Sequence, residues 1–95
     1  MVIIFVEHFL TEKGKIFFPH WIKDVESSLN QFNGFKLISQ LNDLENDKRS
    51  LLILEFESNE FLKIWTSSKE HDLKVKELGK FMTSKPKSQI LAFNR

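Results

Sequence analysis

The fold is decided by residues 55–71, which read EFESNEFLKIWTSSKEH. The end of an apolar strand leads here into a short amphipathic helix, a break and a histidine. Ser58 has the side chain of a helix N-cap, and Ser67 with Glu70 has the spacing of a capping box. The region from about 59 to 82 is therefore predicted to form two consecutive helices.

A break at residues 66–68 decides where Trp65 and His71 point. On an unbroken helix, at ~100° per residue, the two side chains would lie about 120° apart. A break allows both to face one cavity. Trp65 is then either a core residue or a shelf for a ligand, and His71 is either a core or capping histidine or a base in a pocket. His71 also heads an apolar stripe at helical spacing, formed by Val75, Leu78 and Met82.

The segments before this region alternate strand and helix patterns. Residues 2–9 are apolar on both alternations, so both faces of this strand need a cover. The helix that follows is expected to begin at about Lys15 or Ile16, after a turn at 11–14, because Pro19 is tolerated only near a helix start. Asn33 and Gly34 are expected to end it.

Three more strands complete the pattern. Residues 35–41 are predicted to lie near a sheet edge, residues 51–56 are predicted to be central, and residues 89–93 are predicted as a short last strand after Pro86. The order β-α-β-β-α-β with right-handed crossovers gives an α+β, ferredoxin-like antiparallel sheet with the helices on one face.

The helix-free face of this sheet needs a cover of its own. We expect Val2, Ile4 and Val6 to lie on that face, and a domain of 95 residues buries only roughly 60–70% of its unfolded surface. A second copy of the same sheet is the simplest cover, so the sequence predicts a homodimer that forms a dimeric α+β barrel.

The composition excludes several classes of protein. Lys and Arg number 14 against 13 Asp and Glu, without a basic block, so nucleic acid is not an expected partner. The chain has no cysteine, which favours a cytoplasmic location, and the opening apolar run is too short for a membrane span or a signal peptide. No metal site is expected, because the three His are not paired at helical spacing, and no glycine-rich phosphate loop is present.

A set of residues that runs through nearly the whole chain has a familiar arrangement: Gly14, Phe18, Trp21, Val25, Phe32, Gly34, Phe35, Phe56, Glu57, Ser58, Glu60, Phe61, Trp65, Ser68, Glu70 and His71. This set resembles the antibiotic biosynthesis monooxygenase family. The resemblance implies a single domain over residues 1–95, a dimer, and an oxygenase that needs no cofactor and acts on phenols or quinols. Some relatives degrade haem with a first-strand Asn, but that position holds Glu7 here, so no haem turnover is expected.

Glu7 and His71 are the candidate catalytic bases. Glu7 is expected beneath the helices on the face of Phe9, where a carboxylate is either functional or solvated at the strand end. His8 is expected on the opposite face, as a hydrogen-bonding residue of the dimer interface. The candidate ligand-binding residues are aromatic, namely Trp65, Phe9, Phe61 and Trp21.

Two functions fit these candidates. In the first, a base removes a proton from a small aromatic or quinol-like substrate held between sheet and helices, and the resulting anion reduces dioxygen. In the second, a non-catalytic homodimer binds a hydrophobic small molecule. The two differ in whether a base reaches into the cavity.

Overall fold

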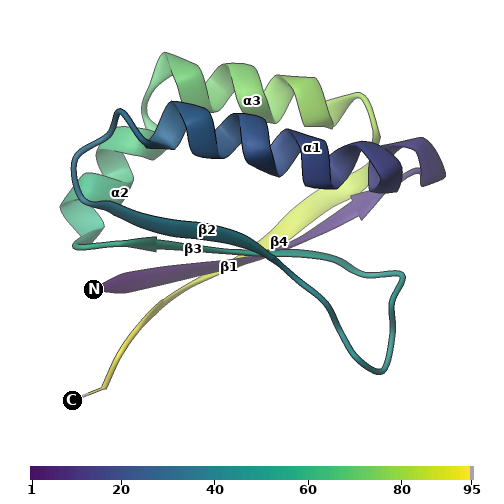
Figure 1. The fold of residues 1–95 in the computed structure, drawn as a ribbon, viewed down its shortest axis with the longest axis horizontal. Helices are drawn as coiled ribbons and strands as arrows, with labels where there is room; N and C mark the ends of the chain where they lie inside the picture. Colours follow the sequence, from purple (N-terminus) through teal and green to yellow (C-terminus); the bar gives the residue numbers. More distant parts are fainter. Residues whose placement is uncertain (95) are drawn as a thin grey trace.

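The strand patterns pair into one antiparallel sheet with the order β2-β3-β1-β4, and three helices lie on one of its faces (Figure 1). The computed structural model describes residues 1–94. The elements in chain order are β1 (Val2–Leu10), α1 (Glu12–Leu29), β2 (Phe35–Leu41), β3 (Ser50–Phe56), α2 (Asn59–Thr66), α3 (Lys69–Gly79) and β4 (Met82–Ala92). The predicted ferredoxin-like α+β fold is confirmed, with β2 at an edge and β3 inside the sheet.

The two faces of the sheet are the reverse of the prediction. Val2, Ile4 and Val6 face the helices, because they pair directly with Phe56, Leu54 and Leu52 of β3, and these β3 residues belong to the core. Ile3, Phe5, Glu7 and Phe9 therefore face the helix-free side. The alternation of side chains along β1 could not show which face the helices cover, since the residues on both faces are apolar. The pairing with β3 decides which face is covered.

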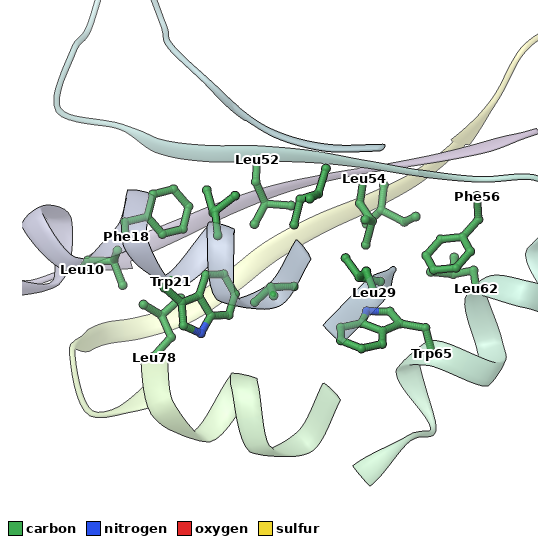
Figure 2. Close-up of a cluster of buried hydrophobic side chains, with 14 residues drawn as sticks. Leu10, Phe18, Trp21, Leu29, Leu52, Leu54, Phe56, Leu62, Trp65 and Leu78 are labelled. Atoms are coloured by element: carbon green, nitrogen blue, oxygen red, sulfur yellow. The ribbon is translucent and has the colours of Figure 1, made fainter. Parts of the chain in front are cut away.

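The core fills the space between the sheet and the helices. Figure 2 shows Trp21 of α1 and Trp65 of α2 pointing into this cluster. Phe18, Leu29, Phe56 and Leu78 are fully buried, and the remaining core residues are Ile4, Leu10, Trp21, Ile22, Val25, Ile38, Leu52, Leu54, Leu62 and Trp65. The indole Nε1 of Trp21 donates a 2.8 Å hydrogen bond to the carbonyl of Lys74, which joins α1 to α3.

The first helix begins earlier than its proline predicts. Thr11 is the N-cap, and its Oγ1 accepts a 3.1 Å hydrogen bond from the Gly14 amide, so the expected turn at 11–14 is wrong. Pro19 lies inside the helix on an exposed position, where the chain tolerates the lost amide. The helix ends at Leu29, ahead of the predicted end at 33–34.

Gly14 is required where the first helix meets the start of β4. A Cβ added there would lie 2.6 Å from the Cβ of Phe81 and 3.0 Å from the Cβ of Leu10. The helix can therefore approach these two side chains only because position 14 has none.

The break between α2 and α3 is confirmed, but its cap is Ser68. Ser58 caps α2, accepting from the Phe61 amide, as predicted. The Oγ of Ser68 accepts a 3.1 Å hydrogen bond from the His71 amide and donates a 2.6 Å bond to the Trp65 carbonyl. Ser67, the predicted N-cap, is instead the C-cap of α2, and its backbone amide donates to the carbonyl of Lys63. One hydroxyl therefore joins the end of α2 to the start of α3.

The last strand is longer than predicted and contains Pro86. It is an edge strand, and its pairing with β1 shifts between Glu7 and Phe9, which pair with Lys87 and Ser84. Pro86 lies in this irregular stretch, where its missing amide breaks no regular ladder. The expected strand start after Pro86 is therefore wrong.

Replacing Ser68 by Ala should destabilise the protein by about 1 kcal/mol, because the start of α3 loses its cap. Ser67→Ala is the matched control and should stay within about 0.5 kcal/mol of the parent, as its hydroxyl caps neither helix. Urea unfolding followed by circular dichroism measures both. Equal losses for the two variants would contradict the assignment of the cap.

Candidate functional site

The structure separates the two candidate bases. Glu7 and Phe9 lie on the helix-free face near the end of β1, whereas His71, Trp65, Trp21 and Phe61 belong to the helical layer or the core beneath it. The expectation that Glu7 lies beneath the helices is therefore wrong. Glu7 and His71 cannot act on one substrate in one cavity of this chain.

Glu7 is held by an arginine from the loop between β2 and β3. Its two carboxylate oxygens each accept a 2.9 Å hydrogen bond from Arg49, through Nε and Nη2. Nη1 of Arg49 donates a third 2.9 Å bond to Asp43. The hydrogen bonds from Arg49 lower the pKa of Glu7 and also that of Asp43. Glu7 therefore remains ionised and paired, and its side chain is only 18% exposed.

His71 lies against Trp65, as the predicted break allows. The two rings meet edge to face with their centroids 5.4 Å apart. The imidazole Nδ1 is buried, 3.5 Å from a carboxylate oxygen of Asp72, and makes no hydrogen bond within residues 1–94. The side chain is 30% exposed, so other atoms of the ring reach the surface.

The other aromatic candidates pack in the core or against it. Trp65 is buried and meets Phe32 edge to face at 5.0 Å. Trp21 is buried and has its Nε1 bonded to a backbone carbonyl. Phe61 packs over Gly34, where an added Cβ would come 2.4 Å from the ring. Trp65 is thus a core residue whose indole also packs edge to face against the imidazole of His71.

The candidate residues of the part described, 1–94, line two surface hollows. The α3 hollow, about 410 Å³, is lined by Lys69, His71, Asp72, Leu73, Val75 and Lys76. The β1 hollow, about 280 Å³, is lined by Glu7, His8, Phe9, Leu10, Lys15, Asn46, Lys48, Arg49 and Thr83. Each contains a histidine, and the β1 hollow also contains the ion-paired Glu7.

His8 is the residue whose position the sequence reasoning missed. It faces the helices and is 8% exposed, so its expected place on the helix-free side is wrong. Its ring lies 5.3 Å from that of Phe18 and 5.7 Å from that of Trp21. Burial lowers the pKa of His8 to about 4, and its Nδ1 has no hydrogen-bond partner among the described residues. The alternation with Ile4 and Leu10 would have placed it here, once the face of Ile4 was known.

Within residues 1–94, no three His, Cys, Asp or Glu side chains are grouped to hold a metal ion. None of the helices in that range is long and apolar enough to cross a membrane.

Comparisons with known proteins agree on the fold. No family model and no curated protein matches the sequence. A protein from Deinococcus radiodurans, provisionally named an antibiotic biosynthesis monooxygenase, has a TM-score of 0.85 at 12% identity, over 100% of this chain and 94% of its own. SnoaB, a cofactor-independent oxygenase from Streptomyces nogalater, has a TM-score of 0.79 at 12% identity, over 99% and 94%. A similarly named protein from Nitrosomonas europaea has a TM-score of 0.83 at 11% identity, over 98% of both chains.

The chain therefore has the fold of the antibiotic biosynthesis monooxygenases, as its resemblance implied. This likeness extends over nearly the whole of each chain compared.

The free energy of unfolding should fall by about 2 kcal/mol between pH 7 and pH 5 because of His8. The folded-state pKa of about 4 lies below the ordinary value of 6.5. The unfolded chain therefore takes up a proton on His8 in this range while the folded chain does not. Glu7 and Asp43 lose their contribution only at lower pH, since their pKa values are depressed.

Urea unfolding at a series of pH values measures this slope, and His8→Leu should flatten it above pH 5. His20→Gln is the control, because His20 is exposed on α1 and should leave the slope unchanged. A slope that survives in His8→Leu would contradict the burial of a neutral imidazole.

Proposed function

We propose that the protein is a cofactor-independent monooxygenase that oxidises a small aromatic or quinol-like substrate at the α3 hollow. The observation that carries this proposal is the imidazole of His71, which lines an open hollow, is backed by Trp65 and has Asp72 beside its buried Nδ1. The fold supports it, because SnoaB, a cofactor-independent oxygenase, has the same fold over nearly its whole length.

The lining of the α3 hollow suits a phenolic substrate. Leu73 and Val75 are apolar and exposed, at 56% and 42%, and offer a surface to an aromatic ring. The ammonium groups of Lys69 and Lys76 line the same hollow and favour a phenolate over a neutral phenol. Histidine is the side chain that ordinarily exchanges protons near neutral pH, so His71 is the base of choice over the ion-paired Glu7.

The substrate would supply all the electrons of the reaction. His71 removes a proton from a ring CH₂ group or its phenol tautomer, and the resulting anion transfers electrons to dioxygen. The CH₂ carbon becomes a carbonyl that keeps one oxygen atom, and the other oxygen atom leaves as water. The carbon loses four electrons and dioxygen gains four, so no external reductant is required.

With anthrone as the probe, the protein should speed oxygen uptake and place one labelled atom from ¹⁸O₂ in the anthraquinone product. His71→Gln should lower the rate by about 10²–10⁴, the usual contribution of a general base. His20→Gln is the matched control, since His20 lies exposed on α1 beside Asp24 and should leave the rate unchanged.

An oxygen electrode and mass spectrometry report the rate and the label. Equal rates for His71→Gln and the parent would refute the role of His71. Saturable binding of anthrone without any acceleration of its oxidation would instead favour the alternative function, a non-catalytic binder of a hydrophobic small molecule.

We also infer that a second copy of the chain covers the helix-free face, in a cytoplasmic homodimer; the absence of cysteine supports this location. The pairing of the strands puts a row of apolar side chains on that face. They are Ile3, Phe5, Phe9, Leu37, Leu41, Ile53 and Leu91. Apolar side chains that the helices leave uncovered are typical of an interface, and two identical sheets cover each other symmetrically.

Light scattering after size exclusion should report about twice the 11.3 kDa mass of one chain. Ile53→Lys should shift the protein toward the monomer, because it places a charge in the middle of the apolar face. Ile16→Lys is the control, since Ile16 is exposed on α1 away from that face. A parent protein that elutes as a stable monomer would contradict the inferred dimer.

A further inference from the structure

The β1 hollow is assembled from four separate parts of the chain. β1 contributes residues 7–10, α1 contributes Lys15, the loop between β2 and β3 contributes Asn46, Lys48 and Arg49, and β4 contributes Thr83. The pairing of β1 with β3 ends at His8 and Ser50, so the last residues of β1 extend beyond β3. Figure 1 shows the β2-β3 loop and the start of α1 at this same end of the molecule. The hollow is therefore a product of the tertiary fold.

Its rim carries an excess of positive charge. Three cations, Lys15, Lys48 and Arg49, line the hollow against the single carboxylate of Glu7. Arg49 already forms ion pairs with Glu7 and Asp43. Lys15 pairs at 3.3 Å with Glu12, a side chain that is almost fully exposed. For Lys48, no carboxylate of residues 1–94 lies within ion-pair distance.

Its inner wall carries a buried polar group that lacks a partner. His8 lines the hollow and is more than nine-tenths buried, and its imidazole makes no hydrogen bond to any described residue, although its Nδ1 itself is closed off from solvent. Buried nitrogen atoms in folded proteins nearly always have a partner. Leu10, which lies on the same face of β1 as His8, supplies apolar surface to the same hollow.

We propose that the β1 hollow binds a small organic anion, a hydroxylated aromatic carboxylate of about one ring. The carboxylate would pair with Lys48 and Lys15 at the rim, the ring would lie against Leu10 on the helical side of β1, and the hydroxyl would meet the imidazole of His8. The volume of about 280 Å³ is smaller than that of most ligand sites, which favours a single-ring molecule over a nucleotide or a polycyclic one. This site is separate from the α3 hollow and does not depend on the proposed oxidation.

Salicylate is the probe, followed by calorimetry and by the NMR shifts of His8 and Lys48. The parent should bind it in the millimolar range or tighter, and salicylamide, which lacks the negative charge, should bind about tenfold more weakly. Lys48→Glu should weaken salicylate binding by about tenfold or more. Lys23→Glu makes the same change of charge on the exposed side of α1 and should leave binding unchanged.

His8→Leu tests the inner wall. The parent should prefer salicylate over benzoate, which lacks the hydroxyl, and the variant should lose this preference while still binding both. The proposal is overturned if the parent does not bind salicylate at millimolar concentration, if Lys48→Glu and Lys23→Glu weaken binding equally, or if salicylate shifts His71 in place of His8. Because the readout is binding at His8 and Lys48, failure here leaves the oxidation of anthrone at His71 standing, and failure of that oxidation leaves this site standing.

Discussion

The pairing of β1 with β3 is the constraint on which the rest of the structure depends. It sets Val2, Ile4 and Val6 beside Phe56, Leu54 and Leu52, and this combined surface is the one that the helices cover. Because side chains alternate along a strand, the same register sends Glu7 to the helix-free face and His8 into the helical side. A carboxylate and an imidazole that are neighbours in sequence thus end in opposite environments, one ionised and paired, the other neutral and buried.

The helical layer is held in place by two small polar contacts. The hydroxyl of Ser68 connects the end of α2 to the start of α3 and thereby brings His71 against Trp65. The Trp21 indole connects α1 to α3 through the Lys74 carbonyl. The Ser68 hydroxyl satisfies backbone groups at two helix ends, and the Lys74 carbonyl satisfies the buried indole N–H of Trp21. Both contacts fix the relative positions of the helices without burying an unpaired charge.

The two hollows differ in the chemistry they offer. The α3 hollow has a partly exposed imidazole beside a carboxylate, which suits proton transfer to and from a bound molecule. The β1 hollow has a neutral, buried imidazole and an excess of cations at the rim, which suits the recognition of an anion. Glu7 stands in the second hollow as the partner of Arg49, and this pairing makes it a structural group and a poor proton acceptor.

Local patterns in the sequence determined the number and order of the elements, the cap at Ser58, the edge position of β2 and the meeting of Trp65 with His71. These features depend on side chains within a turn or two of one another, and capping and periodicity describe them well. The neighbouring serines at the break were not distinguished by spacing alone, since only the formed turn directs the hydroxyl of Ser68 to both helices.

Only the tertiary structure decided which face of β1 is covered, and with it the places of Glu7 and His8. Both alternations of that strand are apolar, so its own residues carry no preference, and the choice comes from β3 and from Arg49, which lies 42 positions away in sequence. The same holds for Pro86, which is compatible with a strand only because that strand lies at the edge of the sheet. Residues far apart in sequence decide which face of β1 is covered and where Pro86 fits, because the free-energy difference between the possible arrangements comes from contacts between those distant residues.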